Sequence, residues 1–237
     1  MSVAISDISN ADFLKRLKKS RTAIIPIGSL EQHGAHLPLS TDSIISERIA
    51  TLVAEQLKCF VLPSVSVGVS VEHVPMFNVS LRNSTLSEML QDICVSLSAQ
   101  GISQIIFINA HHGNSGALQY ISQNLTSEVR TNTRIYSIDY WSALRNGIDH
   151  AGEVETSLIL AISPHLVKMK DAKPNSRKLS KSRLAYSVMT RSPGSFPRIT
   201  GNGVWGEPRR ATKEKGHILL KEIVTNLIQL ISELQTQ

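Results

Sequence analysis

The sequence has few of the features that would indicate a secreted or membrane-bound protein. Its 237 residues include only two cysteines, Cys59 and Cys94, both in apolar segments. A disulfide framework is therefore excluded, and buried free thiols are expected. The longest apolar runs, such as residues 105–108, are far shorter than the roughly 20 residues of a membrane helix. The N-terminal residues lack the continuous apolar stretch of a secretory signal, so we expect a cytoplasmic protein with no membrane partner.

Aromatic residues are also scarce, at 5% of the chain. The net charge is +6, but no basic stripe alternates with stacking side chains, so we expect no nucleic-acid partner. The positive excess is concentrated between Lys168 and Arg191, where Asp171 is the one acidic residue. A solvated loop would explain this segment. The alternative is that part of it folds over a binding site as a lid and attracts an anionic ligand such as a phosphate ester.

The order of apolar and polar segments predicts one α/β domain over residues 1–237. Apolar runs at 22–27, 60–62, 103–109 and 134–138 are typical of strands, and those at 22–27 and 103–109 indicate strands buried on both faces. Three segments have the apolar spacing of a helix. The first begins at Ser43, the second follows a capping box formed by Thr85 and Glu88, and the third extends from about residue 116 to 129. This alternation predicts a parallel sheet with helices on both faces.

Two polar clusters directly follow predicted strands, which is where parallel sheets collect their chemistry. The first, GSLEQHGAHLPLSTD at residues 28–42, contains Glu31, His33, His36 and Asp42. Residues two apart in an extended segment point to the same side, so Glu31 and His33 can face one cation. Carboxylate and imidazole together suit zinc, manganese or iron(II), whereas calcium prefers oxygen alone.

The second cluster, NAHHGN, contributes His111 and His112, and a third, HAGEVETS, contributes His150, Glu153 and Glu155. Each residue alone is compatible with an ordinary surface position, and Glu153 fits the first turn of a helix, where the dipole favours acidic side chains. The convergence of two strand ends nevertheless favours a metal site. A histidine and a carboxylate facing a metal would act as proton carriers.

Together with GVWGEPRRAT, these blocks resemble the successive signatures of the creatininase (creatinine amidohydrolase) family, in order and spacing, over roughly residues 22–216. The resemblance implies a three-layer α/β/α fold and hydrolysis of amide-type C–N bonds. It also implies a centre of one or two divalent ions and a homo-oligomer, frequently a hexamer.

Carried over by motif, the resemblance implies the following roles. Glu31 and His111 bind one metal, His33 binds the other, and Asp42 bridges both. His150 and Glu155 are the expected catalytic residues. His36 orients a ligand from outside the first coordination shell, while His112 and Trp205 are candidates for substrate binding.

Departures from the family pattern bear on the substrate. Creatininase has a glutamate ligand of the second ion where this chain has Gly113, so Glu155 or water would have to replace it, and a substrate-region turn is altered at residues 76–79. The compact length, Gly113 and the basic surplus, including Arg82, favour a phosphorylated formylamino-pyrimidine ribonucleotide over creatinine.

Three alternatives remain open. In the first, the substrate is a small cyclic amide such as creatinine. In the second, the enzyme releases a C-terminal dipeptide from a modified precursor peptide. In the third, the chain is a non-catalytic ligand-binding scaffold. The retained acidic and histidine residues argue against a scaffold, since burying charge without an ion is costly. No glycine-rich dinucleotide loop follows a strand, so no cofactor beyond metal is indicated.

Overall fold

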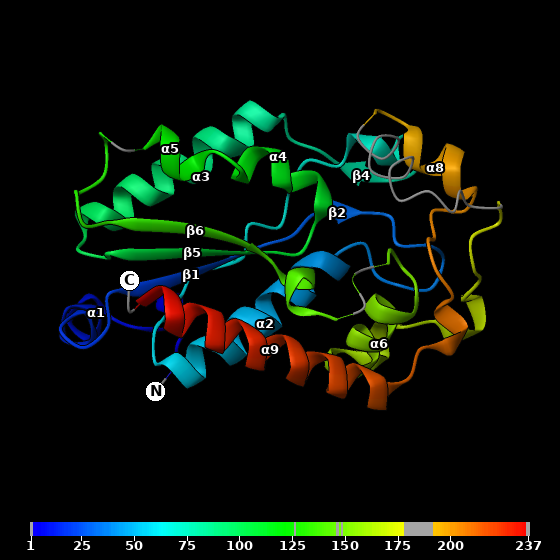
Figure 1. The fold of residues 1–237 in the computed structure, drawn as a ribbon. Helices are drawn as coiled ribbons and strands as arrows, with labels where there is room; N and C mark the ends of the chain where they lie inside the picture. Colours follow the sequence, from blue (N-terminus) through cyan, green and yellow to red (C-terminus); the bar gives the residue numbers. More distant parts are fainter. Residues whose placement is uncertain (1, 126, 146, 148, 178–191, 236–237) are drawn as a thin grey trace.

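A parallel sheet forms the centre of the molecule in the computed structural model, which describes residues 2–125, 127–145, 147, 149–177 and 192–235 (Figure 1). Four parallel strands pair in this described part in the order β3 (Phe60–Val61), β1 (Thr22–Ile27), β5 (Gln104–Asn109) and β6 (Arg134–Asp139). In register, Ile24 lies beside Ile106, which lies beside Tyr136. The strands predicted from apolar runs are therefore confirmed, although β3 is short.

Both faces of the sheet are buried, which explains why the central strands are apolar throughout. Successive side chains of a strand point to opposite faces. Ile24 and Ile106 accordingly enter one core cluster, whereas Ile25 and Phe107 enter the other. All six residues of β1 and all six of β5 are buried.

Helices cover each face and complete the predicted three-layer α/β/α arrangement (Figure 1). One face carries α2 (Thr41–Leu57), α6 (Glu153–Ile162) and α9 (Lys213–Gln235), and the other carries α3 (Asn83–Ala99), α4 (Ser115–Leu118) and α5 (Ile121–Asn124). Helix α9 was not among the predicted elements. Its buried positions, Leu220, Ile223, Leu227 and Ile231, follow the helical repeat.

Smaller elements surround the sheet. Helix α1 (Asn10–Leu17) lies at its amino-terminal end, and α8 (Ser195–Thr200) lies near the carboxyl-terminal end (Figure 1). Two short strands, β2 (Leu30–Glu31) and β4 (Asn78–Val79), pair antiparallel. Short 3-10 helices include η2 (Val71–His73), η3 (His112–Asn114), η4 (Tyr140–Ala143), η5 (Pro164–Leu166), η6 (Met169–Asp171) and η7 (Pro208–Arg210).

Three local predictions were wrong. Asp42 lies inside the first turn of α2 rather than in a loop, a position that the helix dipole favours for a carboxylate. Helix α3 begins at Asn83 with Arg82 as its N-cap and no side-chain cap, so Thr85 is already helical and makes no capping box. The helix expected over 116–129 is divided, because the backbone of Tyr120 leaves the helical region.

Two expectations concern the surface. No helix of the described chain is long and apolar enough to cross a membrane. Of the basic segment 168–191, residues 178–191 lie outside the described residues, and so the expected lid lies largely outside them too.

The two cysteines test the packing of the core. Cys59 and Cys94 are free and buried, at 1% and 0% exposure, and burial raises the pKa of each thiol to about 12. Because the thiolate is the reactive form, we expect a disulfide reagent to leave the native protein unmodified and to react with both thiols after denaturation. A Ser84→Cys variant, whose new thiol lies on the exposed start of α3, should react at once. Rapid reaction of the unaltered native protein would contradict this packing.

Candidate metal centre

The polar clusters converge at the carboxyl-terminal end of the sheet. Strand β1 ends at Ile27 and β5 ends at Asn109, which are paired in the ladder. The chain leaving β1 carries Glu31 and His33, and His111 lies just beyond β5. Residues near the start of α6 complete the cluster. The two strand ends predicted to meet do so.

The Asp42 carboxylate connects two histidines from different segments. Its Oδ1 lies 3.0 Å from Nε2 of His33, and its Oδ2 lies 3.3 Å from Nδ1 of His111. Each oxygen therefore faces a different imidazole, as a carboxylate shared between two centres requires. All three side chains are buried.

The position of Asp42 depends on close packing between β1 and α2. A Cβ atom on Gly28 would lie 2.5 Å from the backbone nitrogen of Ser43 and 2.7 Å from its Cα. Real Cβ atoms do not approach backbone so closely, and only glycine permits this contact without displacement. Gly28 thus holds the first turn of α2, and Asp42 with it, against the end of β1.

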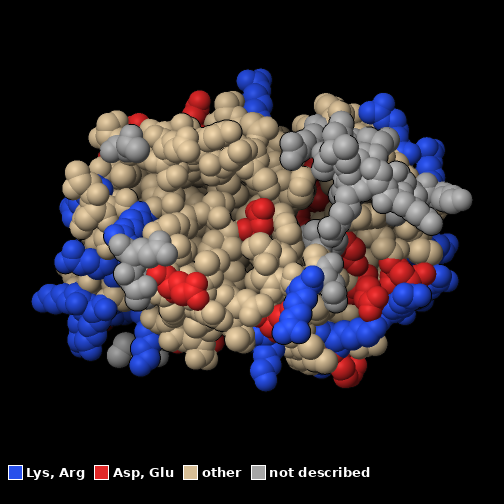
Figure 2. All heavy atoms as spheres, in the orientation of Figure 1, with Lys and Arg blue, Asp and Glu red and all other residues tan. Residues whose placement is uncertain are grey.

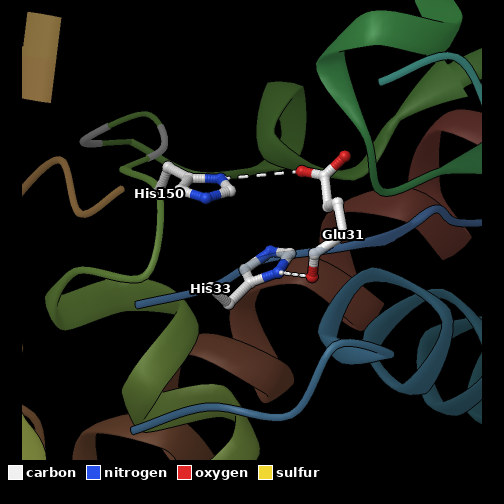
Figure 3. A group of neighbouring side chains, drawn as sticks. All are labelled: Glu31, His33 and His150. Atoms are coloured by element: carbon white, nitrogen blue, oxygen red, sulfur yellow. Dashed lines mark hydrogen bonds and ion pairs between the residues drawn. The ribbon is translucent and has the colours of Figure 1, made fainter. Parts of the chain in front are cut away.

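Glu31 lies at the middle of the cluster. Its Oε1 is 3.0 Å from Nε2 of His73, 3.3 Å from Nδ1 of His111 and 4.0 Å from Nδ1 of His150. Figure 3 shows the His150 ring facing the Glu31 carboxylate, while Nδ1 of His33 turns toward the Glu31 carbonyl oxygen, 3.1 Å away. Ligand atoms of Glu31, His33 and His150 all lie within 4.8 Å of one another.

Two triads share Asp42 and have donor sets suited to a divalent cation. They are Glu31 with Asp42 and His111, and His33 with Asp42 and Glu155, and within each triad the ligand atoms lie within 4.8 Å of one another. The first triad contains the residues that the resemblance implies for one ion, and the second places Glu155 beside His33 and Asp42.

The hydrogen bonds of these residues fit a metal. Both carboxylate oxygens of Glu31 and Oδ2 of Asp42 are buried and accept no hydrogen bond from the described residues, although imidazole nitrogens lie at ion-pair distance. Nδ1 of His33 lies 3.1 Å from the Glu31 carbonyl, and Nε2 of His111 lies 2.8 Å from the Val69 carbonyl. If these nitrogens donate, the other nitrogen of each ring is left for a cation, the arrangement usual for metal-binding histidines.

In the protein alone, protons balance the buried charge of this cluster. Burial disfavours a charged His33, but Asp42, with smaller contributions from Glu155 and Glu31, outweighs burial and raises the pKa of His33 to about 10. The pKa of His111 is raised for the same reason, mainly by Glu31 against burial. Burial likewise opposes a charged Glu31, but His111 and His73 outweigh burial and hold its pKa well below the usual value. The same carboxylates that retain these protons would favour a cation.

His150 differs from His33 and His111 because its surroundings favour the neutral imidazole. Burial and then repulsion from His33 and His73 lower its pKa well below the usual value. Its ring stacks on His33 at 4.3 Å between centroids and meets Phe196 edge-on at 4.7 Å. An imidazole without a proton on one nitrogen is able to accept one.

Glu155 occupies the first turn of α6 beside an unusual backbone. Its Oε2 accepts a hydrogen bond of 2.6 Å from the amide of Ala151, whose φ is 50°, a region that non-glycine residues rarely adopt. Burial, together with Asp42 and Asp149 and against the effect of His33, raises the pKa of Glu155 to about 8. Asp149 caps the helix through the amides of Val154 and Glu155. Glu153 instead pairs with Lys215.

The remaining predicted residues lie around the cluster. His36 is buried, and its Nε2 lies 2.9 Å from Oγ1 of Thr156 in α6, so it connects the segment 28–42 to the helix that carries Glu155. Trp205 holds His150 through two backbone hydrogen bonds of 2.7 and 3.0 Å. His112 is exposed and stacks on Trp141.

Sequence reasoning missed residues that the structure adds to the cluster. Glu72 and His73 form a further group with Glu31, and Nε2 of Gln32 lies 2.8 Å from His73 and 3.2 Å from His150. A Cβ on Gly113 would overlap the Val69 carbonyl oxygen and lie 3.0 Å from Oε1 of Glu72. A side chain therefore has no room at position 113.

Comparison with known protein families agrees with this geometry. The family model described as "Creatininase: Creatinine amidohydrolase" matches residues 6–231. The chain belongs to the creatininase family. It is accordingly a hydrolase of the kind that acts on C–N amide bonds, as the sequence motifs predicted, and its residues provide groups able to hold a divalent metal.

Known proteins resemble the chain over nearly all or about half of its length. The mycofactocin precursor peptide peptidase of Mycolicibacterium smegmatis is 31% identical, with 90% of this chain and 85% of the relative covered. The creatinine amidohydrolase of Pseudomonas putida is 24% identical, covering 98% and 97%. A 2-amino-5-formylamino-6-ribosylaminopyrimidin-4(3H)-one 5'-monophosphate deformylase of Methanococcus voltae is 30% identical but covers only 50% of this chain and 45% of the relative.

Solved structures show the same fold. A crystal structure of creatininase superimposes with a TM-score of 0.82 at 23% identity, covering 98% of this chain and 97% of the other. Other creatininase structures include a manganese form and a zinc–zinc form.

The buried His36 makes the stability of the metal-free protein depend on pH. Burial, with repulsion from His33, lowers its pKa from 6.5 to about 4, so the unfolded chain takes up a proton that the folded chain refuses. The resulting stability is present above 6.5 and is lost as the pH falls toward 4. In a His36→Gln variant, the free energy of unfolding measured with urea should decrease less between about pH 7.5 and about pH 5 than it does in the unaltered protein.

The exposed His165 provides the matched control. A His165→Gln variant should keep the pH dependence of the unaltered protein. An identical slope in His36→Gln and the unaltered protein would show that His36 does not titrate as its burial requires.

Proposed function

We propose that the protein is a divalent-metal-dependent amidohydrolase that uses the cluster around Asp42 to hydrolyse an amide C–N bond. The observation that supports this proposal is the arrangement of Asp42, whose two oxygens face His33 and His111 at 3.0 and 3.3 Å. In this proposal Glu31, Asp42 and His111 hold one ion, and His33, Asp42 and Glu155 hold a second. When bound, a divalent cation lowers the pKa of coordinated water and polarises an amide carbonyl.

The residues of the chain contribute positioning and proton transfer. His150 is the proton carrier, because its neutral ring lies at the edge of the cluster, 4.0 Å from Oε1 of Glu31. It accepts a proton from the attacking water and returns it to the leaving nitrogen. The backbone pairing of His150 with Trp205 and the contact of its ring with Phe196 fix its orientation. Glu155 combines the roles of ligand and charge partner to His33, from which it lies 3.7 Å.

The Asp42→Asn variant tests the shared carboxylate. It keeps the size of the side chain but removes the charge that both triads use. We expect metal content, measured by elemental analysis of the purified protein, to fall together with activity. Losing several kcal/mol of charge stabilisation in the transition state should lower kcat by at least about a hundredfold.

The exposed Asp92 of α3 gives the same chemical change at a distance from the cluster. The Asp92→Asn variant should retain full metal content and activity. Unchanged metal content in Asp42→Asn would refute the proposed centre.

For the substrate, we propose a small non-peptide amide, with a formylamino-pyrimidine ribonucleotide as the first compound to test. The basic surplus of the chain and the likeness to the deformylase of Methanococcus voltae support this choice. The backbone amide of Lys168 donates to the His36 carbonyl at 2.8 Å. Among the described residues, no salt bridge joins the side chains of Arg82, Lys168, Lys170, Lys173 or Arg177 to the candidate ligands. The support therefore comes from composition and similarity.

A second candidate is release of a C-terminal dipeptide from a modified peptide. The mycofactocin precursor peptide peptidases favour it, because their similarity extends over most of both chains at 30 and 31% identity. A cyclic amide such as creatinine ranks below both, since the altered residues 76–79 and Gly113 depart from the creatininase pattern.

Parallel assays distinguish these substrates. Protein loaded with manganese, zinc or iron(II) would be tested for formate release, dipeptide release and creatine formation, each with Asp42→Asn as the matched inactive control. We expect formate release that the variant lacks. Dipeptide release or creatine formation alone would replace the proposed substrate, and turnover unaffected by Asp42→Asn would contradict the mechanism itself.

A further inference from the structure

A large basic cavity lies at the other end of the sheet from the metal-ligand candidates. Its volume is about 1100 Å³, and its floor includes Thr22 and Gln104, the first residues of β1 and β5. Five residue steps at about 3.3 Å place the two ends of these strands roughly 16 Å apart. A ligand in this cavity would therefore be separate from the site described above.

Positive charge dominates the cavity wall. Two acidic residues, Asp12 and Glu55, line it. The cations that line it lie on α1, in the segment between α1 and β1, directly after α2 and at the start of β6: Lys15, Arg16, Lys19, Arg21, Lys58 and Arg134. Figure 2 shows Lys and Arg atoms gathered at the end of the molecule where α1 lies in Figure 1.

Among the described residues, no salt bridge pairs these cations with a carboxylate. The salt bridges that lysine and arginine form with carboxylates of the described residues involve Arg145, Arg209 and Lys215, none of which lines the cavity. The carboxylate of Asp12 accepts a hydrogen bond of 2.7 Å from the hydroxyl of Ser9, the N-cap of α1. Six like charges in one hollow repel one another, and an anion would offset that repulsion.

Part of the wall is already ordered. The guanidinium of Arg16 donates to the Ser2 carbonyl at 2.7 Å and lies over the Phe60 ring at 4.6 Å. On the floor, the hydroxyl of Thr22 donates to Oε1 of Gln104 at 2.9 Å, and both residues are only 7% exposed. A ligand would meet groups whose conformation is partly fixed before it binds.

The lining indicates the chemical class of the ligand. Besides the charged residues it consists mainly of hydroxyl and amide side chains, with Val3 and Leu57 as the apolar members and no aromatic ring among the lining residues. Nucleic-acid grooves use aromatic rings for base stacking, which this cavity does not offer. Guanidinium and ammonium groups with hydroxyl donors suit phosphate oxygens.

We propose that this basic cavity binds a small oligophosphate ligand, held by Lys19 and Arg21 among its cations. Binding rests on charge and hydrogen bonding and does not depend on the metal centre. Ligand binding at this cavity can therefore be measured without a catalytic assay, and its failure would leave the proposed function untouched.

Calorimetric titration with sodium tripolyphosphate at about 50 mM salt tests it, because low salt preserves interactions between exposed charges. We expect saturable binding of one tripolyphosphate per chain. In the Lys19→Gln/Arg21→Gln double variant the Kd should rise by at least about tenfold, which corresponds to about 1.4 kcal/mol. Both side chains are exposed, so folding should be unaffected, as circular dichroism would verify.

A Lys170→Gln/Lys221→Gln double variant removes the same charge from exposed positions outside the cavity and should bind like the unaltered protein. Equal weakening in both variants would show a general charge effect and overturn the proposal. Absence of saturable binding would overturn it too, as would equally strong binding of citrate, because the site would then not be specific for phosphate. If the cavity variant instead alters the oligomeric state in sedimentation analysis while tripolyphosphate does not bind, the cavity is an interface between copies of this chain.

Discussion

The sharing of one buried carboxylate between two histidines is the constraint on which the site depends. Asp42 has to present one oxygen to His33 and the other to His111, and these three residues come from a loop, a helix and the end of a strand. The parallel sheet brings the strand ends together. Gly28 allows the first turn of α2 to approach β1 so closely that any side chain at position 28 would overlap with the backbone of Ser43. Fold and site are thus connected through a few backbone contacts.

Charge balance is the second feature of the cluster. Carboxylates and imidazoles are packed where water is excluded, and burying them is costly unless opposite charges compensate. Glu31 and Asp42 keep protons on His33 and His111, while the same environment keeps His150 neutral. The cluster therefore contains two kinds of histidine. His33 and His111, beside the carboxylates, are suited to holding a cation, and the neutral His150 is suited to transferring a proton.

Much of this could be predicted from the sequence, and the failures have physical reasons. The strands β1 and β5 were recognisable because burial on both faces requires continuous apolar runs, and the ligand candidates because they follow those strands. Glu72 and His73 were missed because they do not directly follow a predicted strand, and their approach to Glu31 depends on tertiary packing. The expected cap at Thr85 failed because α3 begins two residues earlier, at a point that local sequence preference did not mark. Nothing in the sequence marked the interruption at Tyr120.

The burial of the candidate ligands also has a kinetic meaning. Glu31, His33 and Asp42 are at most 1% exposed, so an ion among them would have no ligand that faces bulk solvent. Departure of the ion would have to wait for a local opening of the surrounding loops. Exchange with chelators would then proceed at the rate of that opening, however strong the chelator, and a metal acquired during folding would be retained long after its supply had changed.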